Sequence, residues 1–206
     1  MSSITSFAGA TTDQIASLTA ADIKTLSAKA GEIQKLTTAQ IQVLSADQVA
    51  AIDTSAIVNL SSAQIKAFST DQVQYGFSTT QIGALNSQQM AYLTAAQISV
   101  LQTDQIDAFR DDASKVKALT TAQISAMSAE QLREIEDASA DAQLTTPQLQ
   151  KLTAGQLDII NELTTDQVKA LATSQVSKLS MAQIRSMSSD QAAALTSTQV
   201  QSLTAP

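Results

Sequence analysis

Hydrophobic residues recur along this chain at two fixed positions of an eight-residue pattern. Residues 37–44 read Thr-Thr-Ala-Gln-Ile-Gln-Val-Leu, and residues 45–52 read Ser-Ala-Asp-Gln-Val-Ala-Ala-Ile. The fifth and eighth positions are apolar, the first is polar and the fourth is Gln. Nineteen such octads begin at residues 11, 19, 37, 45, 53, 61, 78, 86, 94, 102, 120, 128, 145, 153, 164, 172, 180, 188 and 196. Self-similarity at a fixed period indicates a repeat architecture.

The polar positions of the octad predict where each helix begins. Position 1 is Ser, Thr, Asp or Asn in 17 of the 19 octads, and position 4 is Gln in 17. This is a capping box, in which the first side chain and the Gln side chain each accept a hydrogen bond from the other residue's backbone N–H. A box every eight residues predicts a string of helices of about seven residues. Because helices this short are stable only when packed on neighbours, we expect an all-α solenoid with positions 5 and 8 in its core.

Two other architectures fit the pattern less well. In one continuous helix, eight residues overshoot two turns by about 80°, so the apolar stripe would wind around the helix. In a β-solenoid, positions 5 and 8 are three residues apart and would lie on opposite faces of a strand. Position 8 is apolar in all 19 octads, which indicates one consistent core. Tandem short helices provide it.

Several units are longer than eight residues. Residues 27–36 and 110–119 have ten, residues 69–77 and 136–144 have nine, and Asn161-Glu-Leu163 is inserted after an octad. The first three long units stand 41–42 residues apart, which suggests a superhelical turn of about five octads. Ordinary loop variation explains the same lengths equally well, so both interpretations stay open.

The composition narrows the classes of function. The 206 residues include neither Cys nor His, so the sequence predicts no disulfide, thiolate chemistry or transition-metal site. The net charge is −7, and Lys and Arg are scattered singly, which argues against a nucleic-acid partner. No apolar run approaches the roughly 18 residues that a membrane span needs.

Two acidic stretches are the remaining candidates for chemistry. They comprise Asp111 with Asp112, and Glu134 with Glu136, Asp137 and Asp141. Neither has the spacing of a calcium loop, and both lie in or beside the long units, so we interpret them as solvated loops. Without His or Cys, and with five Gly, no nucleophile–base pair or phosphate loop is recognisable. We therefore predict no catalytic, cofactor-binding or metal-binding residues, and no enzyme.

The aromatic residues divide between core and surface. Phe68, Phe77 and Phe109 each stand at the last, apolar position of a unit, which predicts a role in filling the core. Tyr92 stands at position 7 and Tyr75 in a nine-residue unit. These two side chains are the better candidates for surface contacts.

The octad has a resemblance outside this chain. The pattern Thr-x-x-Gln-Ile-x-x-Leu, as in residues 94–101, resembles the Gln-rich octad tracts of long repetitive bacterial proteins of the cell surface and extracellular matrix, often called adhesin-like. The resemblance covers nearly the whole chain from residue 11, and it implies an exported structural role. It carries over no site residue.

The N-terminal residues bear on the compartment. Residues 1–7 lack the basic and apolar regions of a secretory signal. A cytosolic location is one interpretation. The acidic composition, rich in Ser, Thr, Ala and Gln, favours the other, an extracellular or cell-surface protein exported without a cleaved N-terminal signal.

The two ends of the repeat suggest how the protein works. We divide the chain into an N-terminal segment 1–10, a single octad-repeat solenoid 11–203 and a tail 204–206. The last octad follows the pattern as closely as any internal one, and Ile4 and Phe7 keep the spacing of positions 5 and 8. Matching open ends predict head-to-tail stacking of copies into a filament. The expected contacts are Ile4, Phe7, Val200 and Leu203, with residues 1–10 completing a neighbour's last turn.

The alternative is a monomeric solenoid that binds a protein or a cell-surface glycan. This function predicts a cluster of aromatic or charged residues at one variable position of adjacent octads. Position 6 instead mixes Ala16, Lys24 and Gln42 without a trend. Self-assembly therefore ranks first.

Overall fold

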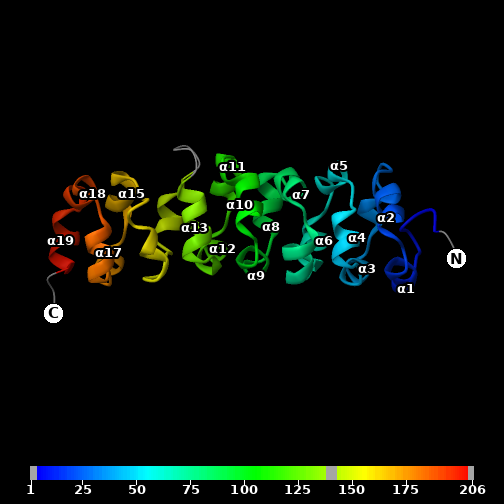
Figure 1. Ribbon diagram of the computed structural model, residues 1–206, viewed down its shortest axis with the longest axis horizontal. Helices are drawn as coiled ribbons and strands as arrows, with labels where there is room; N and C mark the ends of the chain where they lie inside the picture. Colours follow the sequence, from blue (N-terminus) through cyan, green and yellow to red (C-terminus); the bar gives the residue numbers. More distant parts are fainter. Residues whose placement is uncertain (1–3, 138–142, 204–206) are drawn as a thin grey trace. The chain divides into compact units, whose positions relative to one another are not determined.

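The computed structural model describes residues 4–137 and 143–203 of the chain. The chain divides into two compact units, Met1–Phe109 and Arg110–Pro206. Within the described residues every regular element is helical and no strand occurs. The helices of each unit follow one another as short, tandemly packed segments (Figure 1). The predicted fold class, an all-α solenoid of short helices, is confirmed.

The described part of the first unit holds twelve helical elements, the last of which ends one residue into the second unit. They are α1 (Thr12–Ala16), α2 (Ala20–Ser27), η1 (Ile33–Lys35), α3 (Thr38–Gln42), α4 (Ala46–Ala50), α5 (Thr54–Ile57), α6 (Ser62–Ala67), η2 (Gln72–Gly76), α7 (Thr79–Ala84), α8 (Ser87–Tyr92), α9 (Ala95–Ser99) and α10 (Thr103–Arg110). The η1 element is a 3₁₀-helix, and η2 is a π-helical turn in a nine-residue unit.

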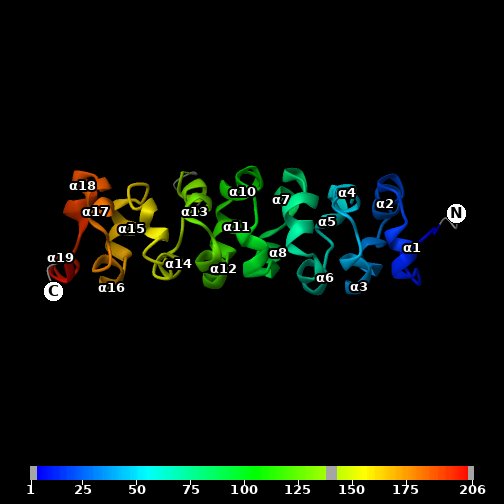
Figure 2. The same cartoon turned by 60° about the horizontal axis from the view of Figure 1, so that its bottom comes forward.

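The second unit continues the same design (Figure 2). Its described elements are α11 (Ala113–Ala118), α12 (Thr121–Ala126), α13 (Ala129–Glu136), α14 (Thr146–Leu149), η4 (Gln156–Ile159), α15 (Thr165–Ala170), α16 (Thr173–Val176), α17 (Met181–Ser186), α18 (Ser189–Ala194) and α19 (Ser197–Leu203). The η4 element is a 3₁₀-helix that ends beside the inserted residues 161–163.

The capping boxes place the helix starts where the sequence predicts them. At α7, the Ser78 hydroxyl accepts from the Gln81 N–H at 3.2 Å, and the Gln81 side-chain oxygen accepts from the Ser78 N–H at 2.9 Å. Most α-helices have five or six residues, fewer than the predicted seven. The reason is position 8, which is often extended; Leu85, for example, has φ −59° and ψ 131°. This residue leaves the helix and leads the chain into the next cap.

Positions 5 and 8 form the core of each unit. In α7 and the residue after it, Ile82 is fully buried and Leu85 is 1% exposed. Phe68, Phe77 and Phe109 are buried as predicted, and the rings of Phe68 and Phe77 meet edge to face with centroids 4.9 Å apart. Tyr75 is 65% exposed and Tyr92 is half-buried, which agrees with surface placement.

One turn of the solenoid contains four repeat units. The Gln at position 4 of a unit hydrogen-bonds to backbone carbonyls of the unit four places earlier; Gln89 of unit 86–93 reaches Ile57 and Leu60 of unit 53–60. We call four consecutive units a coil. The suggested turn of five octads is therefore wrong, because the long units vary in their loops without adding a place to the coil.

Residues 153–163, in the second compact unit, are the exception. This single stretch takes the place of two repeats in its coil. Gln183 reaches the first half of this stretch, at the carbonyl of Ala154, and Gln191 reaches Ile160 and Leu163 in the second half. Counted in this way, the four-place register holds on both sides of the insertion.

Candidate functional site

A typical buried Gln at position 4 makes three hydrogen bonds. The Gln81 side-chain oxygen caps its own helix, and its Nε2 donates to the carbonyls of Val49 and Ile52 at 3.0 and 2.8 Å. The side chain is 1% exposed. A carboxamide is suited to this place because it carries an acceptor and two donors, and all three are used. One residue type thus starts a helix and joins it to the preceding coil.

This arrangement repeats along both units, and we call it the Gln ladder. Its members with two carbonyl partners at positions 5 and 8 include Gln48, Gln64, Gln72, Gln81, Gln89, Gln97, Gln105, Gln148, Gln156, Gln191 and Gln199. Within the described residues no buried side-chain nitrogen or oxygen lacks a partner. The ladder gives the position 8 carbonyl, as at Ile52, a donor that its own short helix does not supply, and it adds a second donor to the position 5 carbonyl, as at Val49, which already accepts from the Ile52 N–H at 3.1 Å.

Sequence reasoning found the capping half of the Gln role and missed the ladder. The signal was present, because a capping box accepts Glu as readily as Gln, yet 17 of 19 octads use Gln and none uses Glu. Only the neutral amide offers donors to a carbonyl. That strict preference indicates a second set of partners.

The first coil, residues 4–36, departs from this rule at position 4. Gln40 donates to the carbonyls of Phe7 and Ala10, which places these two residues at positions 5 and 8 of the first eight-residue repeat. The position 4 residues of the first coil are then Ser6, Gln14, Asp22 and Glu32. Gln14 alone among these has a carboxamide.

The two acids of the first coil differ in their surroundings. The buried Glu32 accepts hydrogen bonds from Lys35, the Ser6 hydroxyl and the Phe7 N–H, in that order of influence, and these lower its pKa to about 2. Asp22 is exposed and accepts from the Thr19 hydroxyl and N–H, which lower its pKa. Glu32 is thus tied to the first coil, whereas Asp22 interacts only with its own cap.

The last coil, residues 172–203, has no ladder above it among the described residues. The carbonyl of Ile184, at position 5, accepts from the Met187 N–H of its own unit at 3.4 Å. No Gln amide of the described chain reaches it. The apolar side chains of this coil become more exposed toward its end, where Leu195 and Leu203 are half-buried and Val200 is 46% exposed. This surface combines acceptors and apolar groups.

The four residues predicted to mediate assembly lie at separate places. Val200 and Leu203 belong to the partly exposed surface of the last coil. Phe7 is fully buried and Ile4 is half-buried in the first coil. Ile4 and Phe7 are three residues apart, as positions 5 and 8 are, but Phe7 itself stands at position 5 and Ala10 at position 8, so Ile4 stands at position 2. Residues 4–10 complete this chain's own first coil, which leaves Ile4 as the more accessible of the two.

Within the acidic stretches Asp111, Asp112 and Asp137 are exposed, whereas Glu136 is buried. Glu136 is 4% exposed, and its carboxylate accepts from the Leu144 N–H at 3.0 Å and from Gln167 Nε2 at 2.7 Å. Burial raises its pKa, against the lowering effect of these two bonds. Asp112 is the N-cap of α11, and its side chain accepts from the N–H groups of Ser114 and Lys115 in that helix. The prediction of a solvated loop is therefore wrong for Glu136, whose two acceptor oxygens serve two donors.

Glu134 and Asp137 form ion pairs with Arg110. Arg110 lies 3.2 Å from Glu134 and 3.8 Å from Asp137. Asp141 lies outside the described residues. No group of three or more acidic side chains within the described residues is arranged to hold a metal ion.

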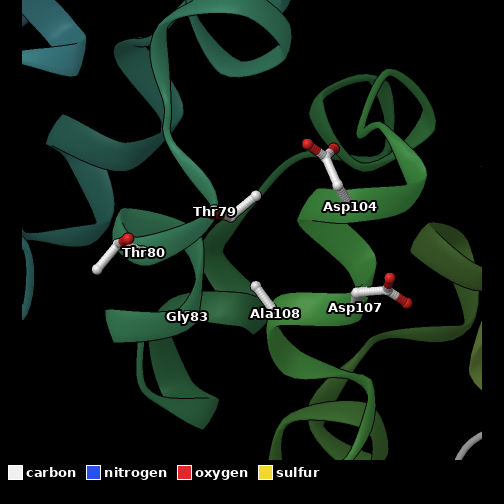
Figure 3. A pocket seen from close by; sticks show the side chains of 6 residues that line it. All are labelled: Thr79, Thr80, Gly83, Asp104, Asp107 and Ala108. Atoms are coloured by element: carbon white, nitrogen blue, oxygen red, sulfur yellow. The ribbon is translucent and has the colours of Figure 1, made fainter.

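A shallow hollow of about 510 Å³ lies between α7 and α10 (Figure 3). Its lining residues are Thr79, Thr80, Gly83, Asp104, Asp107 and Ala108. The helices approach closely here, since a Cβ on Gly83 would lie 3.2 Å from the Ala108 carbonyl oxygen. The carboxylates of Asp104 and Asp107 point in different directions, so they do not form a facing pair for acid–base chemistry (Figure 3).

No helix within the described ranges is long and apolar enough to cross a membrane.

Comparison with known proteins identifies a repeat motif. A family model described as an ALTTAQ repeat matches residues 178–205. The six letters of that description stand as such at residues 118–123, where they join the end of one unit to the capping box of the next. No curated protein and no solved structure matches the chain.

Proposed function

We propose that this protein is a non-enzymatic structural repeat protein that assembles head to tail. The observation that carries the proposal is the last coil, whose paired carbonyls and apolar side chains match those that the next coil covers elsewhere in the chain. Gln14 supplies the complementary group, because its Nε2 has no acceptor within the described residues and its side chain is half-exposed. A second copy brings this amide to the last coil.

The ladder register specifies the junction. If unit 4–10 of one copy follows unit 196–203 of another, Gln14 stands four places after unit 180–187. Its Nε2 then meets the carbonyls of Ile184 and Met187, as Gln191 meets those of Ile160 and Leu163 within the chain. Val200 and Leu203 are covered in the same step, which removes apolar surface from water.

The setting of this assembly is part of the same proposal. A repeat motif and a composition free of Cys and His are consistent with an extracellular or cell-surface filament, or a biofilm-matrix fibre, exported without a cleaved signal. The resemblance to adhesin-like octad tracts supports this setting.

Sedimentation velocity and negative-stain microscopy of the purified chain over a range of concentrations test the proposal. The double variant Val200→Lys, Leu203→Lys should lose long assemblies and keep its helical circular dichroism. Val58→Lys is the matched control, since Val58 is 47% exposed but lies in an interior unit. A wild-type chain that stays monomeric at high concentration in physiological buffer would exclude the filament.

The second candidate function is a binding module for a protein or a glycan. Asp22 and Glu32 favour it, because acids at position 4 make the first coil a poor donor surface. Polar terminal repeats keep solenoids from stacking. A monomeric wild type that binds a partner through the last coil would support this function, and Val200→Lys, Leu203→Lys would then reduce the binding of that partner.

A further inference from the structure

We propose that Asp22 weakens the junction between copies and limits its ladder to the single carboxamide of Gln14. This inference rests on the end-to-end association proposed above, and it names the residue that sets its strength. It follows from the register of the ladder and from the identity of the position 4 residues in the first coil.

The junction brings four pairs of carbonyls to four position 4 side chains. The pairs belong to units 172–179, 180–187, 188–195 and 196–203, and in order they meet Ser6, Gln14, Asp22 and Glu32. Ser6 donates its hydroxyl to Glu32 within its own coil. Gln14 is therefore the one residue of the four that reproduces the interior contact.

Of these four residues, Asp22 has the side chain that opposes the junction. In the register, its carboxylate faces the carbonyls of Ala192 and Leu195, and two sets of acceptors oppose each other without a donor between them. A carboxylate placed there also loses its water, which is unfavourable when no cation or donor replaces it. Asp22 is the only acid at position 4 among the 19 octads, so none of the other octads carries this mismatch.

Glu32 affects the strength of the junction less than Asp22 does, because its carboxylate is already hydrogen-bonded within its own coil. Its carboxylate is held by Lys35, Ser6 and the Phe7 N–H. Asp22, in contrast, accepts only from Thr19 within the described residues. The side chain of Gln makes the same capping contact at all but one of the other 18 octads, so Asp22→Gln preserves the helix start and adds two donors.

The test compares variants of the 206-residue chain by sedimentation velocity. Asp22→Gln should lower the dissociation constant for association about tenfold, since it adds two hydrogen bonds and removes a desolvated charge. Gln14→Glu should weaken association by a similar factor. Asp13→Asn is the matched control, because it removes one negative charge from the same coil at position 3, and it should leave the constant nearly unchanged.

The outcomes separate this inference from the proposed function. If wild type associates and Asp22→Gln is no tighter, or no tighter than Asp13→Asn, the inference is wrong and head-to-tail assembly stands. If wild type is monomeric and Asp22→Gln associates, the inference holds and wild-type assembly is wrong. If both stay monomeric at the highest concentration, both fail. Circular dichroism of each variant verifies that the helices remain.

Discussion

The Nε2 atom of Gln81 lies 2.8 Å from the carbonyl oxygen of Ile52, a residue 29 positions earlier in the chain. The same carboxamide caps helix α7 through its oxygen. Local helix formation and long-range stacking are thus joined in one side chain. A change at this atom should weaken stacking while leaving the cap in place.

Gln81→Glu isolates the ladder in this way. The carboxylate still accepts from the Ser78 N–H, but it cannot donate, and it places a buried charge beside two carbonyls. We expect a loss of about 2–4 kcal/mol in the free energy of unfolding, measured with urea. Gln14→Glu makes the same chemical change at a Gln whose Nε2 has no acceptor within the described residues, and in the dissociated chain it should cost less than about 0.5 kcal/mol. Similar losses at the two sites would contradict the ladder.

At Ala172 the capping box can be tested by a substitution that should stabilise the chain. Its N–H donates to Gln175 at 2.9 Å, but its methyl side chain cannot accept from the helix that follows. Its backbone has the extended conformation of an N-cap, with φ −68° and ψ 146°. Ala172→Ser should therefore stabilise the chain by about 1 kcal/mol, and Thr94→Ala should destabilise it by a similar amount. Thermal melts followed by circular dichroism measure both, and a neutral Ala172→Ser would show that the hydroxyl adds nothing to the amide half of the box.

Much of the fold was predictable because the information is local. A hydroxyl residue at Ser78 and an amide at Gln81 fix the start of α7, and the spacing of Ile82 and Leu85 fixes its buried face. The number of units in a coil was not predictable from the lengths of the long units. It depends on which carbonyls the Gln amide reaches, and those lie about 30 residues away in sequence.

The candidate site was predictable in its location and not in its chemistry. Exposed apolar groups at Val200 and Leu203 follow from the last octad. The role proposed for Asp22 does not, because an acid at this position satisfies the capping box as well as Gln does. The phase of Phe7, which stands at position 5, was not predictable either, since residues 4–10 lack a capping box to mark it.

Two glycines differ in how closely the rest of the chain packs around them. A Cβ on Gly76 would lie 2.9 Å from the Val49 Cβ and 3.2 Å from the Ala46 carbonyl oxygen. A Cβ on Gly155 would meet nothing within 4 Å, and its φ of −70° suits any residue. Gly76→Ala should cost about 1–3 kcal/mol by overpacking, and Gly155→Ala should gain about 0.4–1 kcal/mol by restricting the unfolded chain. Urea unfolding of both variants measures the difference, and a destabilised Gly155→Ala would contradict this account.

Glu136 should make part of the stability depend on pH in an unusual direction. Burial raises the pKa of this carboxyl group above its ordinary value of 4.5. At this group the folded chain then binds more protons than the unfolded chain. The contribution of Glu136 to the free energy of unfolding is therefore complete below pH 4.5, and it is lost as the pH rises through the raised pKa. Glu32, whose pKa is lowered to about 2, has the opposite dependence, since its contribution is lost as the pH falls from 4.5 toward 2.

Glu136→Gln separates the two groups. The carboxamide that replaces the carboxyl group cannot titrate, and with one acceptor it keeps one of the two bonds that the carboxylate accepts from Leu144 and Gln167. The stability of wild type relative to the variant should be greatest near pH 4.5 and should fall as the pH rises, because only wild type then acquires a buried charge. Urea unfolding at several pH values between 4 and 8 measures this difference, in which the effect of Glu32 cancels. A difference that stays constant over this range would mean that the Glu136 carboxyl has the same pKa in the folded and unfolded chains.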